Sequence, residues 1–310
     1  MKTQNLQKQR DLSIDRYRGL AIFLMVIVND IATVNGVPWW LKHAQDIGFT
    51  LADIVAPMFI FAIGLTYQVS FEKKLKKNKK DAYFDTARRY LAFIGIGAVL
   101  SAGEGKVWGV LEAIGVAGLL AMAVIRLGPV ARLLVGGGML AVYQIVLDTY
   151  ALDQVLGNSH GGLIGSVSWG AMLILCTALA QFWHSNQKKF FIALGIVSAA
   201  AAGSACFIPV SKNRVSLSYV LICVAACSLL YILAKILSNR LQKKTDILCF
   251  WGENAITMYL LHLVLMGIMR TVTGFGDVAL SVGMVRVALL VGILTAVAIL
   301  MHRKNIRIAV

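Results

Sequence analysis

Residues 215–237 read VSLSYVLICVAACSLLYILAKIL. The first twenty of these positions carry no charged residue, and about twenty apolar residues are what an α-helix needs to cross a bilayer. Nine other apolar stretches occur at residues 19–34, 50–70, 90–103, 107–125, 129–147, 162–183, 190–209, 248–269 and 279–301. The pattern predicts an all-α fold, a polytopic transmembrane helix bundle of about ten spans.

The overall composition excludes an ordinary soluble domain. Hydrophobic residues make up 58% of the 310 positions and charged residues only 15%, whereas soluble domains carry roughly 25% charge. No linker, low-complexity tract or internal repeat divides the sequence. We therefore expect a single transmembrane domain over residues 1–310, with the bundle at 19–301 between end segments 1–18 and 302–310. The run that begins at Gly19 lacks a small-residue cleavage pattern, which favours an uncleaved first span.

The distribution of basic residues predicts the orientation of the bundle. With a cytoplasmic N-terminus, 24 of the 30 Lys and Arg residues fall on cytoplasmic segments, as the positive-inside rule requires. Both ends of the chain are then cytoplasmic. The run of six lysines between Lys73 and Lys80 lies beside a span, so it favours attraction to anionic membrane lipids over nucleic-acid binding. The net charge of +15 is mainly a signature of topology.

The cysteines give no sign of a disulfide or a metal site. All five lie in apolar stretches, and none forms a CxxC pair or pairs with a histidine at metal-ligand spacing. We interpret them as small packing residues. They are Cys176, Cys206, Cys223, Cys227 and Cys249.

Polar residues flank the first apolar run. Arg16 and Arg18 precede it, and Asn29 follows Arg18 by eleven residues, which is about 16 Å along a helix. Arg18 is thus expected at the inner surface and Asn29 well across the membrane, where polar side chains are functional candidates. Two alternatives stay open: the arginines can be topology anchors, and Asn29 can cap a helix end.

The segment that follows contains a histidine and an aspartate ten residues apart, His43 and Asp53. Residues 37–49 are aromatic and short enough to fold back into a bundle, where His43 would face a cavity. Thr50 is a candidate N-cap with Asp53 at the third helical position, as in a capping box. A surface role for His43 and a purely capping role for Asp53 remain alternatives.

A second histidine lies in the stretch WGENAITMYLLH, residues 251–262. Glu253 and Asn254 are expected near the inner end of this span, with His262 about 12 Å further along the helix. His262 is either a hydrogen-bonded histidine of the bundle interior or part of a reactive cavity.

Taken together, these motifs resemble a known family. The chain reads SIDRYRGLAIFLMVIVND from Ser13, then WWLKHAQDIGFTLADIVAPMFIFAIGLTY from Trp39. This is similar to the opening of the heparan-α-glucosaminide N-acetyltransferase family and its bacterial relatives. Weaker matches follow in the expected order at residues 109–115, 161–166 and 251–262. The chain departs from the family pattern at Glu112 and Ala113, where Gln and Arg are usual, and at Ser159–His160, where an acidic residue and Pro are usual.

The resemblance implies acetyl transfer from cytosolic acetyl-CoA to an amino sugar or related glycan acceptor. It implies His43 as the active-site histidine, assisted by Asn29. Asp53 is a further catalytic candidate from its place near His43. The charges of Arg16 and Arg18 suit the phosphates of CoA, and Asn254 and His262 are further candidates for cofactor binding. A histidine can act as general base or can carry the acetyl group, and the sequence leaves both routes open.

Two other functions stay open from the sequence. An O-acetyltransferase of cell-envelope glycans would keep the reaction and change the acceptor. A small-solute transporter is less favoured, because the sequence shows no inverted repeat. The relatives suggest a homodimer. The absence of an N-x-Ser/Thr site and of a large lumenal domain favours a bacterial plasma membrane, with no nucleic-acid partner.

Overall fold

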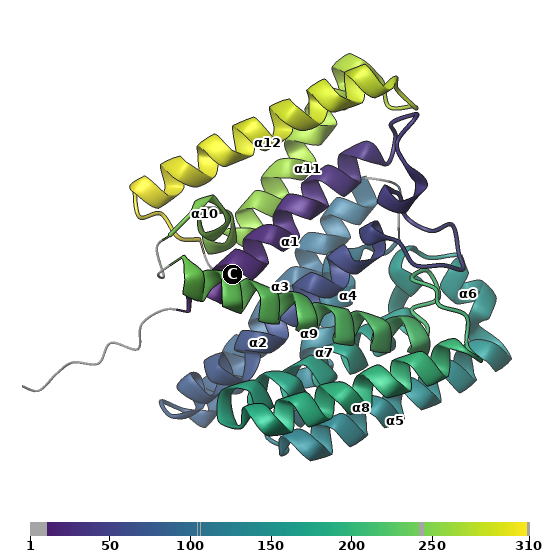
Figure 1. Cartoon of the computed structure of the whole chain (residues 1–310), viewed down its shortest axis with the longest axis vertical. Helices are drawn as coiled ribbons and strands as arrows, with labels where there is room; N and C mark the ends of the chain where they lie inside the picture. Colours follow the sequence, from purple (N-terminus) through teal and green to yellow (C-terminus); the bar gives the residue numbers. More distant parts are fainter. Residues whose placement is uncertain (1–10, 104, 106, 242–244, 309–310) are drawn as a thin grey trace, which may run out of the picture. The chain divides into compact units, whose positions relative to one another are not determined.

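The computed structural model describes residues 11–103, 105, 107–241 and 245–308 (Figure 1). Within these residues the chain is helical and no β-strand forms; one isolated bridge pairs Val34 with Val278. The predicted all-α fold is confirmed. The helices are α1 (Leu12–Ile31), α2 (Val55–Leu75), α3 (Lys79–Gly103), α4 (Val110–Val124), α5 (Pro129–Val146), α6 (Leu152–Leu156), α7 (Gly162–Ser185), α8 (Gln187–Ala205), α9 (Leu217–Arg240), α10 (Ile247–Glu253), α11 (Ala255–Thr273) and α12 (Leu280–Arg303).

Among the described residues, seven helices are long and apolar enough to cross a membrane. They are Leu51–Leu75, Pro129–Leu156, Ser159–Ser185, Gln187–Ala205, Leu217–Arg240, Ala255–Thr273 and Leu280–Arg303. Each coincides with a predicted span. The other three predicted spans also fall on helices: α1 and α3 lie outside this set, and α4 is apolar but only 15 residues long. The length and apolar composition of these helices indicate an integral membrane protein. The count of ten spans stays a prediction.

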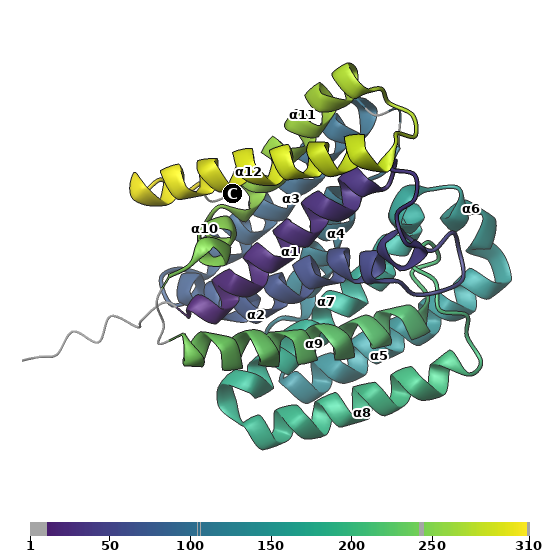
Figure 2. The ribbon, with the colours of Figure 1, turned by 45° about the horizontal axis from the view of Figure 1, so that its top comes forward.

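Two compact units make up the chain, and the boundary between them falls inside α9. The first unit contains the residues up to Asn35 and those from Leu230 onward. In it, α1 packs against α10, α11 and α12 (Figure 2). A Cβ added to Gly19 would lie 1.9 Å from the Leu248 carbonyl oxygen, and one on Gly252 would lie 1.9 Å from that of Asp15. Only glycine allows the backbones of α1 and α10 to approach so closely.

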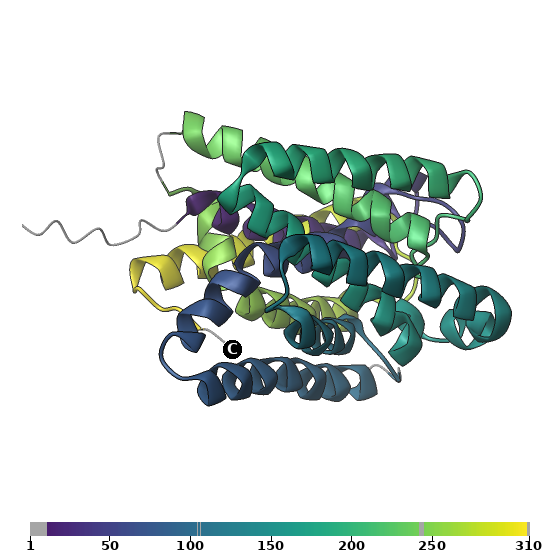
Figure 3. The ribbon, with the colours of Figure 1, turned by 90° about the horizontal axis from the view of Figure 1, so that it is seen from below.

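The second unit comprises Gly36–Leu229 and is built around α7. This helix packs against α2, α4, α5 and α8, while α3 runs beside α4 along one edge of the unit (Figure 3, dark blue). A Cβ at Gly64 of α2 would come within 2.6 Å of the Cβ of Cys176 on α7, so small residues on both helices permit the contact. Cys176 is buried there, as are Cys223 and Cys227 elsewhere in the unit.

One predicted span is interrupted in the structure. The stretch 248–269 divides at Asn254 into α10 and α11, because Asn254 has a non-helical backbone (φ −125°, ψ 45°). Its side chain bonds the chain's own tail: Nδ2 donates to the Ile306 carbonyl at 3.0 Å, and Oδ1 accepts from the Ile308 amide at 2.8 Å. The two bonds hold the described end of the chain against the break.

Candidate active site

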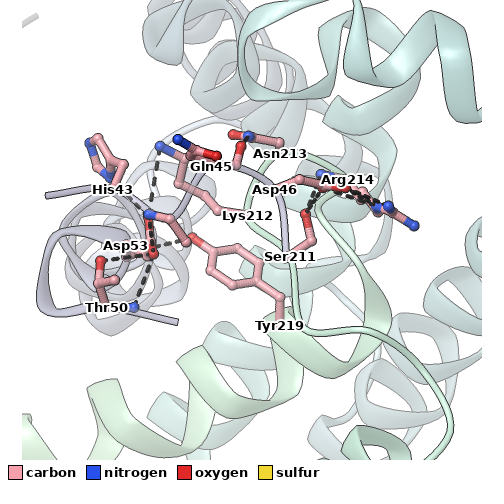
Figure 4. A network of polar contacts seen from close by, with 11 residues as sticks. His43, Gln45, Asp46, Thr50, Asp53, Ser211, Lys212, Asn213, Arg214 and Tyr219 are labelled. Atoms are coloured by element: carbon pink, nitrogen blue, oxygen red, sulfur yellow. Dashed lines mark hydrogen bonds and ion pairs between the residues drawn. The ribbon is translucent and has the colours of Figure 1, made fainter. Parts of the chain in front are cut away.

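A histidine–aspartate pair forms at the start of α2, in the second unit (Figure 4). Nδ1 of His43 lies 2.8 Å from Oδ1 of Asp53, and the Asp53 side chain is fully buried while 37% of the His43 side chain is exposed. Because a carboxylate only accepts, Nδ1 carries the hydrogen and Nε2 presents its lone pair. No described residue bonds Nε2. The pair has the arrangement in which an aspartate orients a histidine that acts as a base.

Asp53 is fixed by its own segment. Its Oδ2 accepts from the Thr50 amide at 3.0 Å and from the Thr50 hydroxyl at 2.9 Å. The predicted capping box is therefore confirmed at the short 3₁₀ helix η2 (Leu51–Ile54), which runs directly into α2. The Tyr219 hydroxyl donates to the Asp53 carbonyl at 2.7 Å and adds a bond from α9. Asp53 thus caps a helix and orients His43 at the same time.

The connection between α8 and α9 is tied to the histidine segment. Nε of Arg214 donates to both carboxylate oxygens of Asp46, at 3.0 and 3.1 Å, and Nη2 also bonds this carboxylate. The Ser211 hydroxyl donates to Asp46 at 2.8 Å. The hydrogen bond from Arg214 lowers the pKa of Asp46 below its ordinary value, against the opposing effect of burial.

Main-chain atoms complete this connection. The side-chain amide of Asn213 donates to the Gln45 carbonyl, and the Gly48 amide donates to the Val210 carbonyl at 2.8 Å. These bonds hold the two loops in a fixed register beside the His43–Asp53 pair. Trp39 and Trp40, in the 3₁₀ turn η1 (Trp39–Leu41), are both exposed.

The same connection places Lys212 at the pair. Its ammonium nitrogen lies 3.9 Å from Oδ1 of Asp53, the oxygen that His43 also contacts. Burial lowers the pKa of Lys212, and the charge of Asp53 partly offsets this effect. The sequence did not single out Lys212, because its partner Asp53 lies far away in the chain. The available signal was that Lys212 is one of only six Lys and Arg residues outside the basic segments.

Asn29 and His262 meet in the first unit. Nδ2 of Asn29 lies 3.2 Å from Nε2 of His262, while Nδ1 of His262 contacts the Tyr259 carbonyl at 2.5 Å. A carbonyl only accepts, so Nδ1 donates and Nε2 accepts from the amide of Asn29. Both ring nitrogens of this buried histidine are engaged. Nη2 of Arg270 donates to the Asn29 carbonyl at 2.9 Å and fixes the end of α1.

The two arginines expected to bind the cofactor lie in the N-terminal part of α1. Arg16 is about 20 Å from Asn29 along the helix axis. Arg16 is almost fully buried, and its Nε donates to Asp246 at 2.6 Å. Burial raises the pKa of Asp246, but the bonds from Arg16 and from the Cys249 amide outweigh it and lower the value. Arg18 is partly exposed, 4.0 Å from Asp15.

The structure pairs His43 with Asp53 in one unit and Asn29 with His262 in the other, whereas the prediction from the sequence grouped Asn29 with His43 and His262 with the cofactor. Arg16 and Asn254 contact other parts of the chain, Asp246 and the tail respectively. A buried carboxylate, an oriented imidazole and an adjacent ammonium can together accept a proton and stabilise developing negative charge.

A family model described as heparan-alpha-glucosaminide N-acetyltransferase, catalytic, matches residues 10–264. The chain belongs to this family. The human heparan-alpha-glucosaminide N-acetyltransferase is 40% identical over 65 residues, which are 21% of this chain and 9% of the human protein. The mouse protein is 36% identical over 76 residues, 24% of this chain and 11% of that protein. The aligned stretch spans about a tenth of the length of these two relatives.

Proposed function

We propose that this chain is a membrane-bound acetyltransferase that moves an acetyl group from acetyl-CoA to the amino group of a glucosamine-type sugar. The observation that carries the proposal is the His43–Asp53 pair, with its buried carboxylate and exposed imidazole, in a chain of this family. Such a pair supplies the base that an amine or hydroxyl acceptor needs before it attacks a thioester.

In the proposed reaction, Nε2 of His43 removes a proton from the acceptor nitrogen while that nitrogen bonds to the acetyl carbonyl carbon. The carbonyl oxygen takes the electron pair of its double bond. When that pair returns, the bond to sulfur breaks and CoA leaves as a thiolate, which recovers the proton from His43. Asp53 keeps Nδ1 protonated, so the lone pair of His43 stays at Nε2.

The proposed role of Asn29 rests on the family resemblance, and the other roles rest on charge and position. We propose that Asn29 assists the transfer with the second hydrogen of its amide, since the first is directed at His262. We propose that His262 and Asn254 support the donor end. Arg18 is better suited than Arg16 to meet a CoA phosphate, because Arg16 is buried and bonded to Asp246.

The proposed topology places both ends and the basic segments in the cytoplasm, with about ten spans forming one domain in a bacterial plasma membrane. Acetyl-CoA then approaches from the cytoplasm, and the acceptor meets the acetyl group near the extracytoplasmic side. A homodimer is part of the proposal only by analogy with the relatives. Cysteine labelling from outside intact cells, at single sites in residues 42–49 and 71–80, checks the sidedness.

Purified protein tests the activity itself. With acetyl-CoA and glucosamine present, we expect release of free CoA thiol that depends on the sugar, together with N-acetylglucosamine in the product. Mass spectrometry with amine-blocked and hydroxyl-blocked sugars separates N- from O-acetylation. Radiolabelled acetyl retained on the protein without acceptor would favour an acetyl-histidine intermediate over direct transfer. Uptake of solute into vesicles in the absence of acetyl-CoA, with no CoA release, would contradict the proposal.

A further inference from the structure

The two cations of the α8–α9 connection differ in how their donors are used. Nε and Nη2 of Arg214 both donate to the carboxylate of Asp46, in a bidentate ion pair. The Lys212 ammonium has only the 3.9 Å contact with Asp53 among the described residues, and no hydrogen bond. An ammonium group has three donors. Lys212 therefore brings unused donors to a mostly buried position, because its side chain is only 14% exposed.

The place of these donors is set by rigid neighbours. The bonds from Ser211 to Asp46 and from Asn213 to the Gln45 carbonyl flank Lys212 on both sides in the sequence. Figure 4 shows the Lys212 side chain reaching past Gln45 to the side of the Asp53 carboxylate where His43 lies. Lys212 and His43 both contact the same oxygen of Asp53. The ammonium and the imidazole are thus neighbours around one carboxylate oxygen.

The charges around this position are few in the described part of the unit. Asp53 and Lys212 balance each other, and Asp46 balances Arg214. Tyr219 donates its hydroxyl to the Asp53 carbonyl, and Cys223 lies one turn further along α9. Lys42, next to His43 in the sequence, forms no ion pair within the described residues. Lys212 is thus the cation that the fold directs to the histidine pair.

We propose that Lys212 is a further catalytic residue, whose ammonium binds the acetyl carbonyl oxygen as that oxygen gains negative charge. The inference rests on the proposed acetyltransferase function. As the acceptor nitrogen bonds to the carbonyl carbon, His43 takes the proton and the double-bond pair moves to oxygen, where it meets the Lys212 cation. When the pair returns, the carbon–sulfur bond breaks and Lys212 is unchanged. A preformed cation in a mostly buried site stabilises such an oxyanion without reorganisation.

The proposed role of Lys212 predicts how turnover depends on pH. Lys212 must be protonated to act, and burial lowers its pKa. Activity should therefore fall as pH rises through this lowered value, which gives the rate profile an alkaline limb. Arginine stays charged throughout this range, so Lys212→Arg should move the limb to higher pH.

Turnover of three variants in the CoA-release assay with glucosamine tests the inference. For Lys212→Met we expect kcat to fall about 100-fold, the usual effect of losing one oxyanion donor, with little change in KM for acetyl-CoA. Lys212→Arg should recover part of this loss and shift the alkaline limb to higher pH. Lys42→Met removes a lysine beside His43 that has no contact with Asp53, and it should behave as wild type. Thermal unfolding checks each variant, and Lys212→Gln replaces Lys212→Met if the latter does not fold.

A readout that needs no turnover completes the test. Isotope-coded acetic anhydride labels neutral amines, and peptide mass spectrometry gives the labelling of Lys212 across pH in the full chain. Its midpoint should coincide with the alkaline limb of wild-type activity. Three results would overturn the inference: Lys212→Met turnover close to wild type, an alkaline limb unmoved in Lys212→Arg, or a labelling midpoint separate from the limb. Absence of CoA release by the wild-type protein would instead refute the proposed function.

Discussion

His43 and His262 are both hydrogen-bonded histidines, but they differ in what their ring nitrogens contact. His43 donates from Nδ1 to a buried carboxylate and its side chain is 37% exposed, whereas His262 is fully buried with Nδ1 on a carbonyl and Nε2 on an amide. A carboxylate stabilises the imidazolium that forms when a base takes a proton, and a carbonyl–amide pair holds a neutral ring in place. The difference favours our proposal that His43 carries the acid–base chemistry and that His262 has a positioning role.

Removal of His43 should have the largest effect on turnover. His43→Gln preserves a polar side chain but removes the base, so we expect kcat in the CoA-release assay to fall by about 10⁴-fold. His184→Gln is the matched control, because His184 is an exposed histidine at the end of α7, outside the network. Full turnover by His43→Gln with an unchanged unfolding temperature would mean that the base lies elsewhere.

Asp53→Asn should have the next largest effect. The amide keeps the size of the side chain but can donate to Nδ1, which favours the tautomer with its hydrogen on Nε2 and its lone pair misplaced. We expect a loss of about 10³-fold in kcat with a smaller change in KM, measured by steady-state CoA release. Thr50→Val is the comparison, because it removes a bond to Asp53 without touching the histidine. Equal losses in both variants would reduce the role of Asp53 to capping.

His262→Leu should have the smallest effect on chemistry and a measurable effect on stability. Loss of the ring leaves the Asn29 amide and the Tyr259 carbonyl without this partner, at a cost of about 1–3 kcal/mol. We expect a lower unfolding temperature and a turnover loss of about 10-fold, through misplacement of Asn29. A loss as large as that of His43→Gln would erase the distinction between the two histidines.

Much of the fold could be predicted because apolar runs of span length are a local property. Seven such runs became the helices long enough to span, and the capping box at Thr50 and Asp53 was readable from four consecutive residues. The break at Asn254 was missed, since it depends on bonds to Ile306 and Ile308 that only the folded chain creates. A continuous apolar pattern cannot reveal such a break.

The candidate site, like the fold, could be predicted from the sequence only where it depends on nearby residues. The His43–Asp53 pair is separated by ten residues in one segment, so sequence spacing and family resemblance could indicate it. The contact of Lys212 with Asp53 joins distant parts of the chain and has no counterpart in local pattern. The pairing of Asn29 with His262 likewise joins two separately predicted spans. Local patterns could indicate candidate residues, whereas their partners depend on tertiary contacts.

The two loops that frame the site are joined partly through main-chain atoms, at the Gln45 carbonyl and between Gly48 and Val210. The side chains of Gln45, Ile47 and Phe49 are meanwhile exposed. Because these bonds use the backbone of residues 45 and 48, the loop register does not depend on the side chains of Gln45 and Ile47. Relatives of this chain can therefore vary at these two surface positions and still inherit the same placement of the histidine pair.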